Sequence, residues 1–151
     1  MNHELLTIAT AASPFLEADA AIPLGMSFGF TPSQVYLLAT IGNILPIIPL
    51  LWFWGRGVAV LSGWSPQLAI LFGRVFAWTR SRHGERMAGA GLATLTLLLA
   101  LPIPFLGAWT ATVLAYLFGF PFWKSFYAIV LGVALGGVVT LVIAQGAAKV
   151  W

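Results

Sequence analysis

Two carboxylic acids and one amide are the residues best suited to chemistry in an otherwise apolar chain. Glu17 and Asp19 follow Pro14, and Asn43 precedes two further prolines in the segment GNILPIIP. A carboxyl group in an apolar zone is costly and points to function, and desolvation is expected to raise its pKa. Such a group suits the binding and release of a proton during transport. The alternative for both acids is a shallower position among hydrated lipid headgroups.

Asn43 lies next to Pro46 and Pro49, which remove backbone hydrogen bonds in the middle of an apolar segment. The carbonyl groups freed there can line a substrate path, with Asn43 beside them. Equally, Asn43 can simply satisfy one of the freed backbone groups.

An enzyme is the less favoured interpretation. Glu17 and Asp19 are too close in sequence to flank a scissile bond, and His3 and His83 lie at the margins of apolar segments. The chain also lacks cysteine, which excludes a thiolate metal site and a cysteine nucleophile. We therefore expect no enzymatic activity, no cofactor and no metal.

Charge is scarce in this chain of 151 residues: 60% of them are hydrophobic and 7% are charged, against about 25% charged in soluble domains. Seven basic and four acidic side chains cannot cover a water-soluble domain. Charge is missing from residues 20–55, 87–123 and 125–148, stretches of 36, 37 and 24 residues. A membrane-spanning helix needs about 20 residues, so only the last stretch fits a single crossing.

An internal repeat explains the two misfitting lengths. Residues 14–42 align without a gap on residues 104–132, with ten identities in 29 positions, including both Pro-Phe-Leu and both Phe-Gly-Phe triplets. Chance predicts roughly two or three identities. Duplicated halves are typical of transporters.

Each repeat begins with a short apolar helix that meets a proline, about Glu4 to Ser13 and about Glu85 to Leu101. A second short segment then runs to the Phe-Gly-Phe turn, and a proline beside that turn (Pro32, Pro121) opens a long helix. Ten helical residues rise only about 15 Å, half a bilayer, so the short segments are predicted to form re-entrant hairpins. A plain four-helix bundle is the competing topology.

The segment between the repeats, residues 55–84, is predicted to be a basic amphipathic helix along the membrane interface. If it does not cross, the repeats are inverted. Lysine and arginine then place this connector in the cytoplasm and both termini outside, with residue 149 as the exception. The basic residues on the connector side are Arg56, Arg74, Arg80, Arg82, Arg86 and Lys124.

The second long helix carries small residues at every fourth position, including Gly132 and Gly136. This ridge allows close approach of another helix. Packing within the subunit is the first interpretation, and a homodimer is the second.

The segments 14–25, 42–46 and 102–113 together resemble the small multidrug export protein family, itself similar to the DedA/SNARE-associated membrane proteins. The resemblance covers nearly the whole chain and implies opposed re-entrant hairpins and transport. The family name suggests export of small toxic compounds. The DedA relationship suggests movement of lipids, such as polyprenyl phosphates, between leaflets. By position, the hairpin motif residues are Pro14, Glu17, Pro23, Gly25, Pro104, Gly107, Trp109 and Thr110.

Two departures from the family pattern stand out. Asp19 occupies a position where the family often has arginine, so a pair of like charges replaces an ion pair and is expected to raise one pKa further. Phe105 and Leu106 stand where the family usually has Gly-Thr and make the second hairpin loop less polar. Within the chain itself, the second repeat has Gly107 where the first has the acid Glu17.

The sequence thus predicts an all-α, multi-pass protein of the inner (plasma) membrane, with inverted repeats in a single domain. Its expected function is proton-coupled export through Glu17, with a small-molecule substrate, protons and membrane lipids as partners. A lipid flippase or scramblase is the first alternative, and a non-transporting scaffold is the second. We expect no nucleic acid partner, because the net charge of +3 comes without a basic face.

Overall fold

The computed structural model describes residues 2–103 and 106–148, apart from the side chains of residues 75–76, 79–80, 82–90 and 148. All regular structure in these ranges is helical, which confirms the predicted all-α class. The elements are α1 (His3–Ala12), α2 (Glu17–Ser27), α3 (Pro32–Ile44), α4 (Ile47–Trp52), the π-helical turn η1 (Phe53–Gly57), α5 (Val58–Trp64), α6 (Pro66–Leu99), α7 (Ala108–Leu117) and α8 (Phe122–Ala148).

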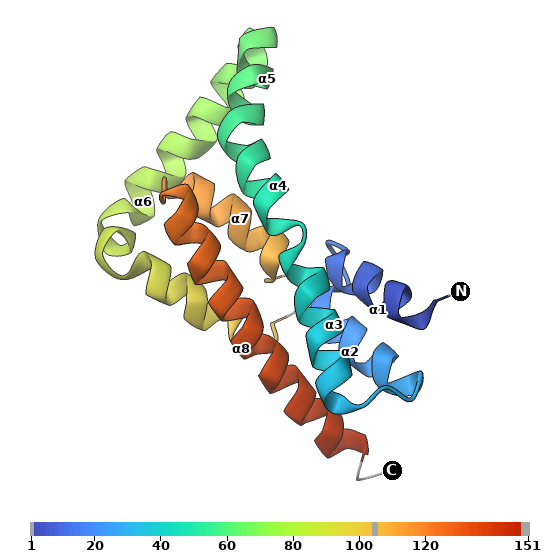
Figure 1. The fold of residues 1–151 in the computed structure, drawn as a ribbon. Helices are drawn as coiled ribbons and strands as arrows, with labels where there is room; N and C mark the ends of the chain where they lie inside the picture. Colours follow the sequence, from blue (N-terminus) through green and yellow to red (C-terminus); the bar gives the residue numbers. More distant parts are fainter. Residues whose placement is uncertain (1, 104–105, 149–151) are drawn as a thin grey trace.

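Two long helical runs point in opposite directions (Figure 1). The first comprises α3, α4, η1 and α5 and breaks only at Leu45 and Pro46, and the second is α8. Both are long and apolar enough to cross a membrane, with mean hydropathies of 1.8 and 2.5 over their most apolar stretches. Their exposed surfaces carry large apolar side chains, among them Leu37, Ile41, Leu131, Leu135 and Val142. A continuous apolar surface of this kind suits lipid rather than water.

The first short hairpin consists of α1 and α2. The ring of His3, at the start of α1, stacks on Phe28, which follows α2, with ring centroids 4.3 Å apart. The two ends of the hairpin therefore lie together, and its tip, residues 13–16, lies at the opposite end. The arm predicted from Glu4 to Ser13 corresponds to α1.

A second hairpin is formed by the last turns of α6, the loop residues 100–103 and 106–107, and α7. The predicted arm from Glu85 to Leu101 is not a separate helix: it continues α6, which begins at Pro66. No proline interrupts the sequence between Pro66 and Pro102, so the helix has no cause to end between them.

Both Phe-Gly-Phe turns end their helices in the same way. Their central glycines have positive φ angles of 82° and 69°. In each turn the second phenylalanine donates its N–H to the carbonyl five residues before it, Phe30 to Gly25 at 3.3 Å and Phe120 to Ala115 at 2.9 Å. This is the hydrogen bond of a Schellman C-cap. The two copies differ in position by the 90 residues of the predicted repeat.

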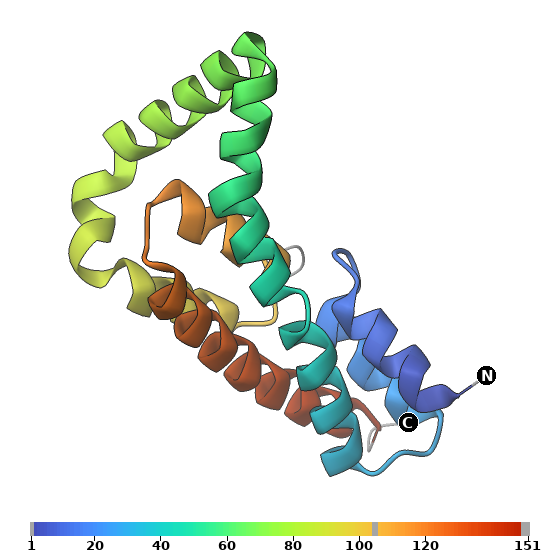
Figure 2. The ribbon, with the colours of Figure 1, turned by 45° about the horizontal axis from the view of Figure 1, so that its top comes forward.

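The helices of the two halves make equivalent contacts. α1 contacts α2 and α3 as α6 contacts α7 and α8, and α2 contacts α8 as α7 contacts α4. One apolar core, around Ile22 and Val35, joins α1, α2, α3 and the end of α8. The other, around Ile47 and Ile129, joins α4, the end of α6, α7 and the first half of α8. The first hairpin thus packs against α3 and the end of α8, and the second packs against α4 and the first half of α8 (Figure 2).

The segment predicted as a separate connector, residues 55–84, belongs to two longer helices. The first run continues through η1 into α5, turns at Ser65, and returns as α6, so that the two form a projecting arm (Figures 1 and 2). Ser65 is extended, with φ −139° and ψ 116°, because the residue before a proline avoids the helical region. The predicted boundary at residue 84 falls inside α6. A position of this arm along the interface stays a prediction.

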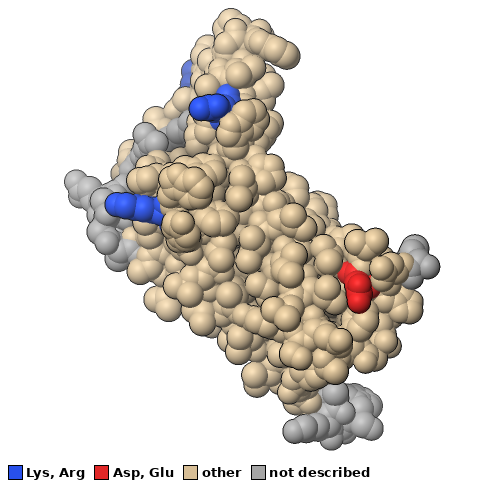
Figure 3. Space-filling view, in the orientation of Figure 1, with Lys and Arg blue, Asp and Glu red and all other residues tan. Residues whose placement is uncertain are grey.

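Arg56, Arg74 and Lys124 are exposed. Basic side chains lie over the arm and near the start of α8, whereas the visible acidic side chain lies over α1 and α2 (Figure 3). The sidedness inferred from lysine and arginine stays a prediction. The side chains of Arg80, Arg82, Arg86 and Lys149 lie outside the described part of the structure.

The small-residue ridge of α8 packs inside the chain. A Cβ on Gly132 would lie 2.7 Å from Leu99 Cβ, and one on Gly136 would overlap the Leu99 carbonyl. Thr96 Oγ1 in α6 donates to the carbonyl of Ala128 at 3.0 Å. The small residues of α8 therefore allow it to pack closely against α6 within the same chain. A homodimer stays a prediction.

Candidate functional site

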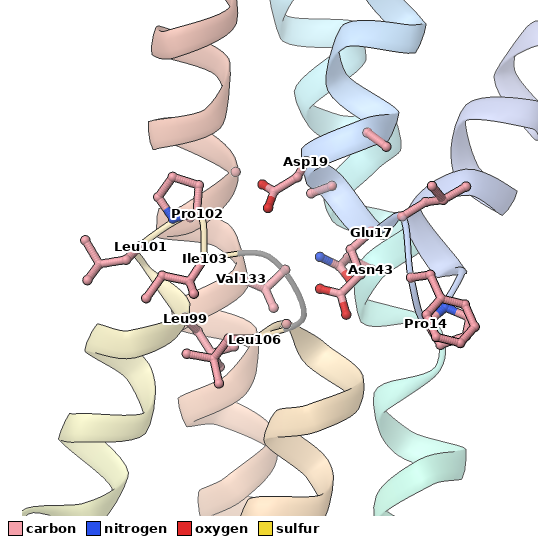
Figure 4. A pocket seen from close by; sticks show the side chains of 17 residues that line it. Pro14, Glu17, Asp19, Asn43, Leu99, Leu101, Pro102, Ile103, Leu106 and Val133 are labelled. Atoms are coloured by element: carbon pink, nitrogen blue, oxygen red, sulfur yellow. The ribbon is translucent and has the colours of Figure 1, made fainter.

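A cavity of about 290 Å³ lies where the two hairpin tips meet. Residues 14–20 form one wall and residues 101–103 and 106–107 another, and Asn43 in the last turn of α3 and the middle part of α8 close it (Figure 4). The three polar residues singled out in the sequence, Glu17, Asp19 and Asn43, all line this cavity. The tertiary structure therefore brings together residues from two different elements of the first repeat, opposite the tip of the second.

Glu17 combines a strained backbone with a close neighbour. Its φ angle of 48° is the one positive value among the non-glycine residues of the described chain, a conformation that costs about 1–2 kcal/mol for a residue with a side chain. Its repeat equivalent, Gly107, faces it: a Cβ on Gly107 would overlap the Glu17 carboxylate. The absence of a side chain at Gly107 therefore makes room for the acid at the start of α7.

Burial raises the pKa of the Glu17 carboxyl from 4.5 to about 7, because desolvation disfavours its charged form. The backbone N–H groups of Ala108 and Trp109, at the start of α7, oppose this rise, and the charge of Asp19 adds to it. Glu17 lies at the start of α2 and is not part of either long helical run. A carboxyl group with a pKa near 7 gains and loses a proton at physiological pH.

Asp19 is the exposed member of the acid pair and lines the cavity from the first turn of α2. Its Oδ1 accepts a hydrogen bond of 2.7 Å from Thr140 Oγ1 on α8. This bond joins the first hairpin to the long helix of the second repeat. The sequence identifies position 140 only as a member of the small-residue ridge, so the bond is visible only in the structure.

Asn43 lies in the last turn of α3 and is 4% exposed. Its Oδ1 has no hydrogen-bond partner within the described part of the chain. A buried acceptor without a partner costs about 1–3 kcal/mol. The oxygen therefore gives no support to the interpretation in which the Asn43 side chain only satisfies a freed backbone group. The residue lines the cavity beside Glu17 (Figure 4).

The motif residues around the tips have structural roles. Trp109 Nε1 donates to the carbonyl of Ala12 at 3.1 Å, which ties α7 to the last turn of α1. A Cβ on Gly25 would lie 3.0 Å from Val35 Cγ2, so this glycine allows α2 to approach α3. Pro14 lines the cavity. Pro23 lies within α2 on its exposed side, Thr110 lies in the first turn of α7, and Pro104 lies outside the described residues.

Comparison with known proteins gives one result. A protein-family model described as "Putative small multi-drug export protein" matches residues 17–139. The chain belongs to this family. No curated protein and no solved structure matches it. The match to the small multi-drug export family begins at Glu17 and includes Asp19 and Asn43, and it ends one residue before Thr140.

Membership of the small multi-drug export family, together with two long apolar helices, supports a location in the membrane. The described residues contain no group of three or more histidine, aspartate or glutamate side chains arranged to hold a metal ion. The chemistry available in the cavity is therefore that of two carboxyl groups, an amide and the first turn of α7.

The contact between Glu17 and Gly107 was not predicted from the sequence. A signal that could have found it was present, because the two residues are equivalent in the repeat. Residues near the axis that relates two halves lie close to their own equivalents, whereas residues far from it are separated. The contact follows once the repeats are folded against each other at their hairpin tips.

Proposed function

We propose that this protein is a small membrane transporter that exports small compounds, with protonation of Glu17 coupled to opening of the cavity between the hairpin tips. The observation that carries the proposal is the position of Glu17: its carboxylate extends from one tip into the space left by Gly107 on the other. The name of the family is consistent with export.

The coupling follows from electrostatics. The first turn of a helix presents partly positive N–H groups, which favour an anion. These N–H groups, of Ala108 and Trp109 at the start of α7, attract the charged Glu17, but burial between the tips outweighs the attraction and raises the pKa of the carboxyl to about 7. The closed arrangement therefore favours the protonated carboxyl, and loss of the proton favours an opening that returns the charged group to water. One proton thus changes the balance between a closed and an open arrangement of the two hairpins.

Inverted repeats with re-entrant hairpins are part of the proposal. The opposite directions of the long runs, the equivalent helix contacts and the matching turns support it. α1, with ten residues, rises only about 15 Å and is too short to cross a bilayer. The stacking of His3 on Phe28 favours a position of both ends of the first hairpin on one side.

Cysteine labelling tests this topology, since the chain has no cysteine of its own. Asn2 and Ser27, near the two ends of the first hairpin, are both exposed. In a re-entrant hairpin, Asn2→Cys and Ser27→Cys react with an impermeant maleimide from the same side of the membrane. The same two variants react from opposite sides if each arm is a full span. Arg56→Cys should react from the side opposite to both, which we take to be the cytoplasm.

Transport is tested in proteoliposomes with an imposed pH gradient and a panel of cationic, neutral and anionic radiolabelled compounds. Glu17→Gln keeps the size of the side chain and removes its titration, so proton-linked transport should fall about tenfold or more. Glu4→Gln is the matched control, because Glu4 is exposed in the first turn of α1 and is not part of the cavity lining. Equal transport by Glu17→Gln and the unmodified protein would refute the coupling.

The alternatives have less support. Carriage of a phosphate-bearing lipid calls for a cationic contact, and no lysine or arginine is among the described residues that line the cavity. A scaffold that binds partners through the glycine ridge conflicts with the use of Gly132 and Gly136 in packing against α6. Translocation of a fluorescent phospholipid in the same proteoliposomes would favour the flippase instead.

A further inference from the structure

The first long helical run is longer than a bilayer is thick. It extends from Pro32 to Trp64, a length of 33 residues, and a helix of that length rises about 50 Å, whereas the hydrocarbon core of a membrane is about 30 Å thick. Charge is absent from residues 20–55 and returns at Arg56, which indicates the end that extends beyond the core. The projecting arm, formed by α5 and the first half of α6, therefore lies outside the hydrocarbon.

The arm nevertheless exposes large apolar side chains. Trp64, at the tip, is 81% exposed. Four more apolar side chains of the arm are exposed, namely Val60, Ile70, Leu71 and Trp78. Within the described structure, α5 packs chiefly against α6 and η1. Because apolar side chains of this size are costly in water, a surface outside the chain is expected to cover them.

The side chains of the arm follow a regular pattern. In each of its two helices, an arginine, a β-branched aliphatic residue and a tryptophan recur at intervals of four residues, and all six are exposed. The two sets are Arg56, Val60 and Trp64 in η1 and α5, and Ile70, Arg74 and Trp78 in α6. Residues four apart lie on the same side of a helix. Tryptophan favours the level of lipid headgroups, and arginine reaches that level with its charged end while its stem covers apolar surface.

We propose that the arm lies among the headgroups of the membrane and binds anionic lipids, with Arg56 and Arg74 as contacts to the headgroup phosphates and Trp64 and Trp78 as anchors. The predicted interfacial position thereby gains a partner of defined charge. The exposed Lys124 adds a basic side chain near the start of α8, and the visible acidic side chain lies far from both places (Figure 3).

Charge complementarity favours anionic lipid. Residues 55–86 hold five arginines and one glutamate, a net charge of +4. The acidic side chains that the structure describes, those of Glu4, Glu17 and Asp19, all belong to α1 and α2. An anionic leaflet attracts a basic segment next to the membrane by about fivefold in affinity for each charge close to the surface.

A second copy of the chain fits this surface less well. In a two-fold dimer the same surface of both copies meets, so the arginines of one arm would approach those of the other. None of the acidic side chains described in the structure lies on the arm to pair with them. Like charges in such an interface repel, whereas headgroup phosphates neutralise them.

The arm must incline toward the membrane to reach the headgroups. A run perpendicular to the bilayer would carry Trp64 about 20 Å past the core, whereas the headgroup layer on each side is about 5–7 Å thick. Tilting of the whole run lowers the tip, and so does a bend at η1. This turn is π-helical and includes Gly55 and Gly57, and helices commonly bend at such turns.

The test places one cysteine at the tip of the arm in the full-length protein, which has no cysteine of its own. Gly63→Cys is suitable, because nothing lies within 4 Å of a Cβ at Gly63. A bimane label on it is followed in nanodiscs of phosphatidylcholine and phosphatidylglycerol, in which one lipid or the other carries a nitroxide near its headgroup. The ratio of quenching by the two nitroxide lipids gives their relative affinity for the arm. We expect a preference for phosphatidylglycerol of about fivefold or more, reduced by high salt.

Charge-removing and charge-keeping variants identify the contacts. Arg56→Gln together with Arg74→Gln should lower the preference to about one, whereas Arg56→Lys together with Arg74→Lys should keep most of it. The same label at Ser27→Cys, on the exposed end of the first hairpin, is the matched control and should show no preference. All of these positions are exposed, and the salt series on Gly63→Cys decides the question if an arginine variant does not fold.

Three results would overturn the inference. Equal quenching by both lipids at all salt concentrations would exclude recognition of anionic headgroups. A label that neither lipid quenches but acrylamide reaches would place the arm in water. A label protected from both lipids and acrylamide only in discs that hold two copies would identify a second copy as the occupant.

This inference does not depend on the proposed function. Glu17→Gln should leave the lipid preference of the arm unchanged, because Glu17 lies in the cavity between the hairpin tips. Loss of the lipid preference would in turn leave the coupling through Glu17 untouched, so the two proposals fail separately.

Discussion

The two hairpin tips face each other with opposite chemistry. In the first, Glu17 carries a carboxylate on a left-handed backbone, and in the second, Gly107 has no side chain and an extended backbone, with φ −116°. The two residues are equivalent in the repeat and lie against each other. Contact between the tips therefore depends on their divergence: two acids at these positions would overlap and repel, whereas one acid and one glycine fit.

The same contrast extends two residues further. Asp19 accepts a hydrogen bond from Thr140 on α8, whereas its equivalent, Trp109, donates one to the Ala12 carbonyl at the end of α1. At these positions the first tip accepts a hydrogen bond and the second donates one. The similar turns and packing hold two unlike surfaces face to face, and the cavity lies between them.

Filling the space at Gly107 should have the strongest consequence. Gly107→Ala places a methyl group where the Glu17 carboxylate lies, so the tips must separate. Overpacking of this kind costs about 1–3 kcal/mol, and proton-linked transport should fall by more than about tenfold. Melting temperature in detergent and proteoliposome transport are the measurements. Gly73→Ala is the matched control, because nothing lies within 4 Å of a Cβ there. Similar behaviour of the two variants would contradict the contact between the tips.

Removing the titration of Glu17 should change how stability depends on pH. Its pKa is raised to about 7 in the folded protein from an ordinary 4.5, so the folded state binds the proton more tightly than the unfolded state. Stability should therefore fall as pH increases from about 4.5 through about 7. Glu17→Gln should flatten this part of the curve. Parallel stability curves for both proteins over this pH range would show that Glu17 is not the group responsible.

A more modest change is expected from the bond between the first tip and α8. Thr140→Val keeps the shape of the side chain and removes the donor to Asp19. We expect a loss of about 1 kcal/mol, since the exposed Asp19 regains hydrogen bonds from solvent. A double-mutant cycle with Asp19→Ala measures the coupling directly, and a coupling energy near zero would contradict the bond. Thr10→Val is the control, since its hydroxyl bonds only within α1.

The weakest of these changes belongs to the second tip. Trp109→Phe removes the indole N–H that donates to the Ala12 carbonyl while it keeps most of the apolar contact. The expected loss of stability is about 0.5–1.5 kcal/mol, with transport reduced less than in Gly107→Ala. Trp123→Phe, at a side chain that is 61% exposed, should leave the melting temperature unchanged. A larger loss at position 123 than at 109 would argue against the link between α7 and α1.

Much of the architecture could be predicted from local pattern. The prolines, the Phe-Gly-Phe triplets and the gaps in charge located α1, α2, α7 and the two long runs, because helix breaks and turns depend on a few neighbouring residues. The connector was predicted less well. Residues 55–64 continue the first long run and residues 66–99 form one helix, because arginine is a good helix former and no proline interrupts α6.

Composition and spacing alone were enough to establish that this chain needs an apolar environment, that its halves repeat, and that Glu17, Asp19 and Asn43 are its unusual polar groups. The folded chain was needed to find that Glu17 meets Gly107, that Thr140 bonds Asp19, and that Asn43 Oδ1 is left without a partner among the described residues. These facts depend on how two hairpins from distant parts of the chain dock, and such contacts leave no local pattern in the sequence.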